Sequence, residues 1–380
     1  MKRMGVILLV VCMMSTCLPM AYAAREGYPG KSALLMEAET GTVLYAQNEH
    51  EQLAPASVTK VMTLLLIMEA IDSGQIKWDD PVTASEAAAA KGGSQVYLKA
   101  GETMTVDEMV KSIAVSSAND CACAMAELLA GSEAAFVEKM NQRAGELGMA
   151  DTHFVNCTGL DDGENAAAHK TSAHDIALMS RELLVNHPQI KKYTTIWMDS
   201  VRDGAFGLSN TNKLVRFYKG CTGLKTGFTS SAGYCLSASA QRDNMELIAV
   251  VMGAESSQDR FDACRGMLDF GFANYGLYRA EVPEEQVAVK LGQTDWVSVR
   301  AGENRPVLVE KAQLGQITTR TQLQEQVSAP VSQGQQLGVM EIVHGSQVLA
   351  RIPLVADRQV GELTWADLFL RLLGKISMAG

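Results

Sequence analysis

The chain has 380 residues and a formal net charge of −10, with 47% hydrophobic and 20% charged residues. This composition is ordinary for a globular protein and excludes disorder throughout. The excess of acidic residues argues against general binding to nucleic acid, which requires clustered Lys and Arg. No long uncharged apolar stretch follows residue 23, which excludes a multispan membrane protein.

The first 23 residues have the pattern of a secretory signal peptide. Lys2 and Arg3 provide a positive start, residues 6–18 are mostly apolar, and residues 21–23 (AYA) have the small-x-small form that signal peptidase accepts. A buried N-terminal helix is the alternative. We therefore predict an exported protein and exclude residues 1–23 from the fold.

Six of the eight cysteines follow this segment. An exported protein could join them in disulfides. However, six cysteines in so long a chain do not make a small disulfide scaffold, and no spacing typical of a zinc site is present. The favoured interpretation is that they are small buried apolar residues.

The pattern after residue 24 predicts one hairpin followed by helices. Residues 33–46 hold two apolar runs around a Glu-Thr-Gly turn, which indicates a β-hairpin. Residues 58–71 are apolar enough to predict a buried helix, ended by a Ser-Gly pair. Helical spacing also predicts two helices within 106–129, broken at 116–119, and a helix over 134–147.

The following stretch predicts one more helix and then three strands. The helix covers 173–185, and residues 224–229 and 234–240 have the pattern of a β-hairpin. Residues 246–253 are almost continuously apolar, as expected of a central strand. With a closing helix over 257–275, the elements predict an α+β domain with an antiparallel sheet.

The sequence changes character after Tyr278. Short apolar runs punctuated by Gly, Pro and Gln predict a small β-sandwich domain at 281–362, following a first domain at 24–280. Residues 363–380 predict an amphipathic helix whose wide apolar arc suits a membrane interface. A terminal helix docked on the sandwich or packed in a dimer is the alternative.

The pattern Ser-x-x-Lys occurs once, at Ser57 and Lys60. Serine is a weak nucleophile at neutral pH and needs a nearby base. A helix places residues i and i+3 on one face, so Lys60 can reach the hydroxyl of Ser57. The helix N-terminus and partial burial both favour the neutral amine, which could take the serine proton. The backbone N–H of Ser57 at the helix start is available to an oxyanion.

Two further polar motifs follow in order. Ser117 and Asn119, separated by one residue, lie at the predicted break between two helices. The hydroxyl of Ser117 could relay a proton to a leaving amine, and the amide of Asn119 could hold a peptide carbonyl. Lys225 and Thr226 on a predicted strand offer a cation and a hydroxyl to a substrate carboxylate. Gly227 has no side chain, so we expect a substrate backbone to lie against this strand.

These three motifs, in this order, resemble the penicillin-binding and β-lactamase set. The wider sequence is similar to the low-molecular-mass penicillin-binding proteins that act as serine-type D-Ala-D-Ala carboxypeptidases. The order of signal peptide, catalytic domain, β-rich domain and amphipathic tail also follows that family. The supporting stretches are residues 54–63 (APASVTKVMT), 92–94 (GGS), 117–122 (SANDCA), 156–160 (NCTGL), 223–229 (GLKTGFT), 231–236 (SAGYCL) and 251–254 (VMGA).

The resemblance implies a penicillin-binding/β-lactamase-like transpeptidase domain, with an antiparallel sheet and a helical cluster, at 24–280. It implies removal of the terminal D-Ala from peptidoglycan stem peptides through an acyl-enzyme, which β-lactams would also form. No metal or organic cofactor is expected. The implied location is the outer face of the bacterial cytoplasmic membrane, bound through the C-terminal helix, or the secreted fraction, and no nucleic-acid partner is expected.

Four residue roles follow from the resemblance for the chemical steps. Ser57 is the acylated nucleophile and Lys60 is the general base. Ser117 shuttles the proton and Asn119 orients the substrate. Ala118 stands where the family often has glycine, a small change.

The third motif is implied to bind the substrate. Lys225 and Thr226 recognise the terminal carboxylate, and the backbone N–H groups of Ser57 and Phe228 form the oxyanion hole. Arg260 falls where some members place a carboxylate-binding arginine, with a helix-surface arginine as the alternative. Thr211 stands where other members have arginine, which leaves substrate preference open.

Several alternatives remain at this point. A class A β-lactamase needs a glutamate between the second and third motifs, and residues 153–161 contain none. A D,D-endopeptidase would use the same machinery, and a non-catalytic wall-binding scaffold would keep a dead site. A Ser-His-Asp triad through His153, His169 or His174 lacks a Gly-x-Ser-x-Gly elbow, so we expect these histidines in solvated or core-edge positions.

Overall fold

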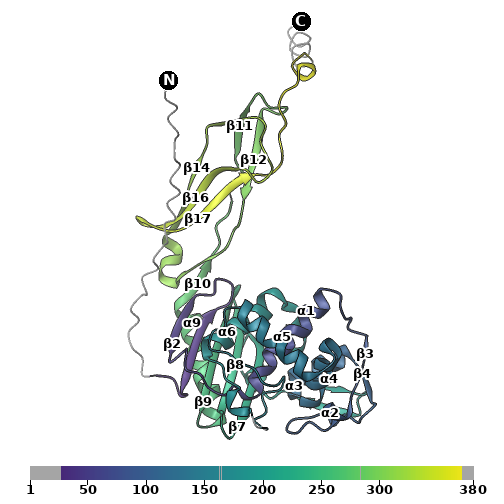
Figure 1. Cartoon of the computed structure of the whole chain (residues 1–380). Coiled ribbons are helices and arrows are strands. Elements are labelled where there is room, and N and C mark those ends of the chain that lie inside the picture. The colour runs from purple at the N-terminus through teal and green to yellow at the C-terminus, as the bar shows by residue number, and fades with distance from the viewer. Residues whose placement is uncertain (1–26, 162, 164, 283, 370–380) are drawn as a thin grey trace, which may run out of the picture.

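The computed structural model describes residues 27–161, 163, 165–282 and 284–369. Figure 1 shows a larger body of helices around a sheet and a smaller β-rich body that stands on it. The predicted signal peptide lies outside the described residues, as does the end of the predicted C-terminal helix, residues 370–380.

A five-stranded antiparallel sheet with the order β2-β1-β9-β8-β7 forms the centre of the larger body. Both predicted hairpins are present, and β9 is the central strand, as its apolar sequence predicted. The strands are β1 (Ser32–Glu37), β2 (Val43–Gln47), β7 (Cys221–Thr229), β8 (Gly233–Arg242) and β9 (Met245–Ala254).

Both faces of this sheet are covered, which explains the continuous apolar run of β9. Ile248 and Val250 belong to one core cluster, shared with helices α1, α3, α4 and α6, whereas Leu247 and Ala249 belong to a second cluster under α9. Alternate residues of a strand point to opposite faces, so a strand buried on both sides needs apolar residues at every position.

The motif-bearing segments lie in the helical layer. The nucleophile candidate lies on a 3-10 turn, η1 (Ala56–Thr59), which leads directly into the buried helix α1 (Lys60–Asp72). The prediction of a helix from residue 58 therefore differs at its first turn. The expected break between two helices is confirmed: α3 (Val106–Ser116) ends at a left-handed Ser117 and α4 (Asn119–Ala130) begins two residues later.

The remaining helices of this body support the site from further away. The helix predicted over 257–275 is α9 (Ser257–Asn274), which covers the second face of the sheet. The others are α2 (Glu86–Ala89), α5 (Glu133–Glu146), η2 (Ala166–Ala168), α6 (Ala173–Asn186), η3 (Pro188–Ile190), α7 (Lys191–Thr194) and α8 (Leu214–Phe217), with the two-stranded pairs β3 (Pro81–Thr83) with β4 (Thr103–Thr105) and β5 (Met198–Val201) with β6 (Phe206–Ser209).

The smaller body is β-rich, as predicted, but its strands join into one six-stranded sheet with the order β14-β16-β17-β12-β11-β15. The first half of β12 pairs with β11 and its second half pairs with β17, so this strand connects the two parts of the sheet. The strands are β11 (Gln286–Lys290), β12 (Trp296–Ala301), β14 (Ile317–Leu323), β15 (Gln326–Ser328), β16 (Gln336–His344) and β17 (Gln347–Ala356).

A short ribbon connects the two bodies. The strand β10 (Tyr275–Tyr278) continues directly from α9 and pairs with β13 (Val307–Glu310), which η4 (Lys311–Gln316) follows. A salt bridge of 2.6 Å between Arg279 and Glu39 lies beside this ribbon. The second body is thus joined to α9 by the chain itself and to the turn between β1 and β2 by this salt bridge.

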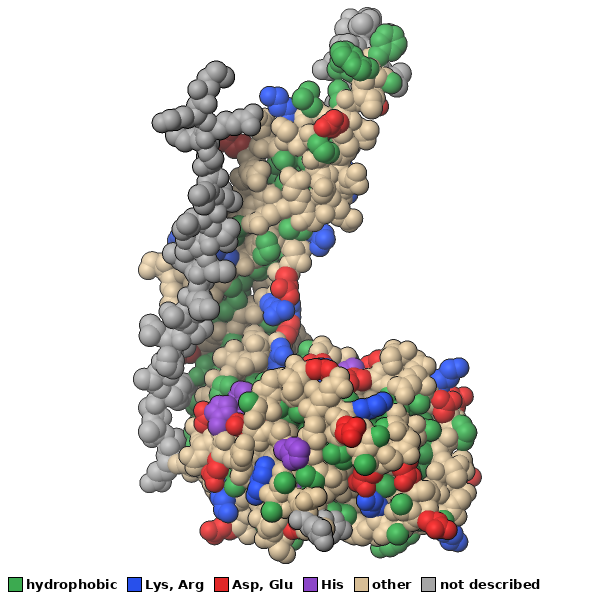
Figure 2. All heavy atoms as spheres, in the orientation of Figure 1, with side chains coloured by type: hydrophobic (Ala, Val, Ile, Leu, Met, Phe, Trp, Pro, Cys, Tyr) green, Lys and Arg blue, Asp and Glu red, His purple; other side chains and the backbone are tan. Residues whose placement is uncertain are grey.

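The described start of the C-terminal segment has an N-terminal cap. The Thr364 hydroxyl accepts a bond of 3.2 Å from the backbone N–H of Asp367. Apolar side chains gather at this tip (Figure 2), where Trp365 is 88% exposed and Phe369 63% exposed. Within the described residues, no helix is both long and apolar enough to cross a membrane.

Candidate active site

The structure brings Ser57 and Lys60 together as the sequence predicted. The Nζ atom of Lys60 lies 3.0 Å from the Oγ of Ser57 and donates a second hydrogen bond of 2.8 Å to the carbonyl oxygen of Thr158. The Lys60 side chain is fully buried, and burial lowers its pKa from 10.5 to about 7. A lysine in this state can accept the serine proton near neutral pH.

Two glycines allow the backbone around the nucleophile to pack closely. A side chain at Gly159, where φ is +81°, would overlap the carbonyl oxygen of Ala56. A β-carbon at Gly227 would lie 2.7 Å from the carbonyl oxygen of Pro55 and 3.1 Å from the backbone nitrogen of Ser57. The space that a side chain at Gly227 would occupy is thus filled by the nucleophile segment. The expectation that a substrate backbone lies against this strand stays a prediction, and β7 is an edge strand of the sheet.

The second motif presents two buried polar atoms that have no hydrogen-bond partner in the described part of the chain. These are the Oγ of Ser117 and the Oδ1 of Asn119. The amide nitrogen of Asn119, Nδ2, donates a hydrogen bond of 2.7 Å to the carbonyl of Gly92, which fixes the orientation of the Asn119 side chain. Buried polar atoms are normally paired, so two unpaired atoms in a candidate site suit a bound substrate.

The third motif places a second buried lysine beside the first. Burial, together with the positive charges of Lys60 and Arg260, holds the pKa of Lys225 well below its usual value. Its Nζ donates 2.9 Å to the carbonyl of Thr226. The hydroxyl of Thr226 in turn donates a hydrogen bond of 2.7 Å to that of Thr211.

Arg260 is buried, with 8% exposure, so the alternative of a helix-surface arginine is wrong. Its Nη1 donates hydrogen bonds of 2.8 Å to the carbonyl of Gly227 and 3.3 Å to the carbonyl of Cys235. These bonds connect α9 to β7 and β8. Phe228 is 53% exposed, and its ring packs 4.3 Å from that of Tyr234. The exposed ring marks the solvent side of β7.

Comparison with known proteins agrees with this geometry. A family profile described as D-alanyl-D-alanine carboxypeptidase matches residues 21–256. The chain belongs to this carboxypeptidase family. A second profile, described as the C-terminal domain of penicillin-binding protein 5, matches residues 272–362.

Individual relatives extend the likeness over nearly the whole chain. D-alanyl-D-alanine carboxypeptidase DacF of Bacillus subtilis is 42% identical, with 98% of both chains covered. Penicillin-binding protein 5 from Haemophilus influenzae has a TM-score of 0.76 at 28% identity, covering 90% of this chain and 100% of the other. Penicillin-binding protein D2 from Listeria monocytogenes, solved in the ampicillin-bound form, has a TM-score of 0.60 at 30% identity, covering 66% of this chain and all of that one.

The predicted enzyme class, a low-molecular-mass penicillin-binding protein that is a serine-type carboxypeptidase, is confirmed by this membership. The combination of a mixed α and β penicillin-binding domain with a C-terminal β-rich domain is likewise confirmed. The β-lactamase and scaffold alternatives are not favoured. In this carboxypeptidase, the second partner of Lys60 is a backbone carbonyl, that of Thr158.

One residue of the site was missed by sequence reasoning. His169, expected in a solvated or core-edge position, is only 4% exposed and its Nε2 lies 2.8 Å from the hydroxyl of Thr59, between the nucleophile and the base. The two residues are 110 positions apart, and no local pattern could indicate the contact. The Nδ1 of His174 lies 3.4 Å from the Oδ1 of Asp175, and His153 is exposed. Neither of these histidines makes a described contact with Ser57.

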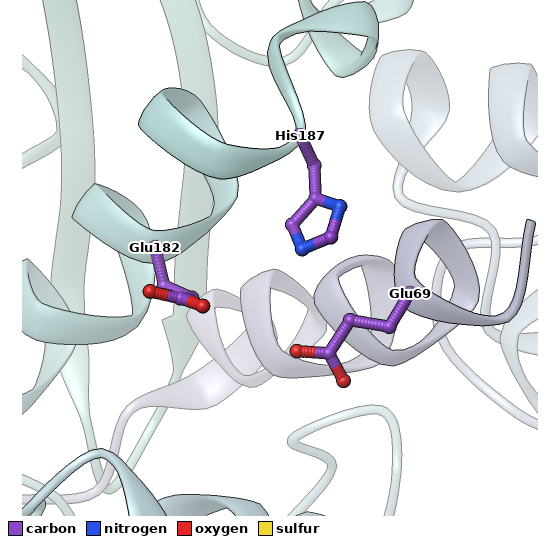
Figure 3. Close-up of side chains that lie close together, drawn as sticks. All are labelled: Glu69, Glu182 and His187. Carbon is purple, nitrogen blue, oxygen red and sulfur yellow. The ribbon is translucent and has the colours of Figure 1, made fainter. Parts of the chain in front are cut away.

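A cluster of possible metal ligands lies elsewhere in the carboxypeptidase fold. Figure 3 shows Glu69 on α1, Glu182 on α6 and His187 just after it, with ligand atoms within 4.8 Å of one another. The guanidinium of Arg143 donates 2.7 Å to each of the two carboxylates, and His187 pairs with Asp72. Both carboxylates are thus already paired with one guanidinium, and the cluster is an ion-pair network that joins α1, α5 and α6.

The cysteines fit the interpretation made from the sequence. In the described part of the chain, all six are free thiols, and five of them are buried. On the face seen in Figure 2, basic and acidic side chains are interspersed rather than gathered by sign.

Proposed function

We propose that this carboxypeptidase removes the terminal D-Ala from peptidoglycan stem peptides through an acyl-enzyme at Ser57. The observation that carries the proposal is the buried Lys60 amine, 3.0 Å from the Ser57 hydroxyl and with a pKa of about 7. A nucleophile and its base within hydrogen-bond reach are the structural requirement for covalent catalysis by serine.

The acylation step uses groups of the first two motifs. The neutral amine of Lys60 takes the proton of Ser57 as its Oγ attacks the carbonyl carbon of the penultimate D-Ala. The backbone N–H groups of Ser57 and Phe228 stabilise the oxyanion. When the C–N bond breaks, the Ser117 hydroxyl gives its proton to the leaving amine and takes one from the Lys60 ammonium. Free D-Ala departs, and Lys60 is neutral again.

The deacylation step returns the enzyme to its starting state. Lys60 takes a proton from a water molecule, whose oxygen attacks the acyl carbonyl. The C–O bond to Ser57 then breaks, the Lys60 ammonium returns its proton to the Ser57 oxygen, and the shortened peptide leaves. Every proton in the cycle is transferred between water, substrate and side chains of this chain.

Substrate recognition is assigned to the unpaired polar groups. The sequence suggested that Asn119 holds a peptide carbonyl, but its Nδ2 already donates to Gly92. Its buried Oδ1 instead accepts a peptide N–H, which gives this atom the partner it lacks. Lys225 and Thr226 bind the terminal carboxylate. Burial lowers the pKa of Lys225, and the negative charge of the bound carboxylate favours the protonated form of this lysine. Arg260 provides a further contact to this carboxylate through its Nε, which has no hydrogen-bond partner among the described residues. Thr211 provides a hydroxyl where other members have a cation, so side-chain preference is expected to differ.

β-Lactams resemble the D-Ala-D-Ala terminus and would acylate the same serine. The ampicillin- and cefotaxime-bound forms of penicillin-binding protein D2 support this part of the proposal, because that protein shares the catalytic fold.

We place the enzyme outside the cytoplasm, because residues 1–23 have the signal-peptide pattern. The exposed Trp365 and Phe369 support a membrane contact by residues 363–380, with the β-rich domain at 281–362 as a spacer from the catalytic domain at 24–280. Removal of 363–380 should abolish flotation with anionic lipid vesicles, and equal flotation of the shortened and full chains would refute the membrane contact.

The activity is tested with diacetyl-L-Lys-D-Ala-D-Ala and the Ser57→Ala variant as a control. We expect release of free D-Ala by the wild type and none by the variant. Cleavage of cross-linked muropeptide dimers at a higher rate would favour the endopeptidase. Rapid β-lactam hydrolysis without D-Ala release would favour a β-lactamase, and the absence of all three activities would favour a scaffold.

A further inference from the structure

The loop at residues 155–159 provides the fixed partner of the catalytic lysine. The carbonyl of Thr158 accepts the 2.8 Å bond from Lys60, and the neighbouring carbonyl of Cys157 accepts a 2.6 Å bond from the hydroxyl of Thr63 on the same helix. Asn156 closes the loop, because its Oδ1 accepts a hydrogen bond of 2.7 Å from the backbone N–H of Gly159. The position of this loop therefore determines where the Lys60 amine lies.

His169 connects this loop to the catalytic turn. Its Nδ1 accepts a 3.2 Å hydrogen bond from the backbone N–H of Val155, and its Nε2 lies 2.8 Å from the Oγ1 of Thr59. The hydroxyl of Thr59 donates its only proton to the carbonyl of Ala56, at 2.8 Å. Consequently Nε2 carries the ring proton and donates it to Thr59, which fixes one neutral tautomer.

The chain of hydrogen bonds ends at a constrained position. Ala56, directly before the nucleophile, has φ of +48°, a conformation that non-glycine residues rarely adopt. Its carbonyl is held by Thr59 and packs against Gly159 of the same loop. Thr59 and His169 are buried, so neither can replace a lost partner with bulk water.

We propose that His169 is a positioning residue for catalysis, which holds the 155–159 loop against the Ser57–Lys60 turn through Thr59 and so sets the distance between the Thr158 carbonyl and the Lys60 amine. It does not contact the reacting atoms. A histidine serves here because one ring offers an acceptor and a donor on opposite sides, toward two separate segments. The inference rests on the proposed acyl-enzyme mechanism.

The first test compares Thr59→Val with Thr59→Ser. Valine keeps the shape but removes the hydroxyl, whereas serine keeps the hydroxyl and serves as the rescue variant. We expect Thr59→Val to lower the second-order acylation rate by penicillin about 10- to 100-fold, because small displacements of a catalytic base have effects of this size. Thr59→Ser should recover most of the rate.

The pH profile separates positioning from a merely structural role. If Lys60 loses its fixed carbonyl partner, its amine gains access to solvent, and the midpoint of the acylation profile should move above that of the wild type. Rates are expressed per active site, counted from covalent label. A structural role would lower the melting temperature or the active fraction but would leave this midpoint unchanged, which would overturn the proposal.

A second variant keeps the test decisive if Thr59→Val does not fold. His169→Asn retains an acceptor for the Val155 N–H but cannot reach Thr59, so it should show the same loss and the same shift of midpoint. In the double variant Thr59→Val with His169→Asn, the two losses of acylation rate should not multiply, because both substitutions remove the same hydrogen bond between His169 and Thr59. Multiplicative losses, or a wild-type rate in His169→Asn, would overturn the inference. A wild type that neither binds penicillin nor releases D-Ala would instead refute the proposed function.

Discussion

The Nζ of Lys60 lies 3.0 Å from the Oγ of Ser57, across the junction of the 3-10 turn η1 and helix α1. Lys60 is fully buried in the core of the catalytic domain, where a charged amine is disfavoured. The same burial that makes this lysine unfavourable for the fold lowers its pKa to about 7 and makes it a base.

The acylation rate should follow the deprotonation of Lys60. Only the neutral amine can accept the serine proton, so the rate with penicillin should rise with pH and reach half its maximum near pH 7. Lys60→Arg, which stays charged, should lower the rate by about 10²- to 10⁴-fold. Stopped-flow measurements from pH 5 to 9 check both. A flat profile, or wild-type acylation by the arginine variant, would contradict the assignment of the base.

Removal of the Ser117 hydroxyl should lower activity without lowering stability. Its Oγ is buried and unpaired, so Ser117→Ala should leave the melting temperature unchanged or raised while kcat/KM falls about 10²- to 10⁴-fold. Ser32→Ala is the matched control, because the Oγ of Ser32 on β1 is also buried and unpaired among the described residues. The control should keep full activity. Equal kinetics in the two variants would remove Ser117 from the proton path.

A methyl group at Gly227 should displace the nucleophile. Its carbon would lie 2.7 Å from the Pro55 carbonyl, so Gly227→Ala must push β7 away from the catalytic turn. We expect at least about a tenfold loss of acylation rate. Gly207→Ala on β6 meets no atom within 4 Å and should be neutral. Stoichiometric labelling of Gly227→Ala at the wild-type rate would show that the close contact is not needed.

The stability of the catalytic domain should depend on His169 below pH 6.5. Burial, with a smaller contribution from the charge of His153, lowers the pKa of His169 from 6.5 to about 4. The folded state thus binds fewer protons than the unfolded state, so stability is complete above pH 6.5 and is lost as pH falls toward 4. The loss at pH 4 amounts to roughly 2–4 kcal/mol.

Urea unfolding at pH 7 and pH 4 measures this loss, with His169→Asn as the control. Carboxylates titrate in the same range in both proteins, so the difference between the two pH dependences isolates His169. The wild type should lose more stability on acidification than the variant. Identical pH dependences would show that His169 accepts a proton without disturbing the fold.

The parts of the site that lie close together along the chain were predictable from the sequence. The spacing of Ser57 and Lys60 placed them on one helical face, and the apolar run of β9 identified the central strand. The contacts that cross between distant segments were not predictable. Nothing local links His169 to Thr59, and a glycine such as Gly227 signals close approach without showing which backbone approaches it.

The β-rich domain shows the same limit. Its short strands could be expected from the spacing of apolar runs and turn residues. Their pairing depends on β12, which changes partner from β11 to β17 between Ser298 and Val299. Such a change leaves no trace in the alternation of side chains, because the strand keeps its period of two throughout.

The most direct test of the acyl-enzyme at Ser57 is intact-mass spectrometry of the full chain after brief exposure to penicillin, followed by peptide mapping of the adduct. We expect one penicilloyl group per molecule, located on Ser57, and none in Ser57→Ala. An adduct on another residue, or an adduct that persists in Ser57→Ala, would show that Ser57 is not the nucleophile.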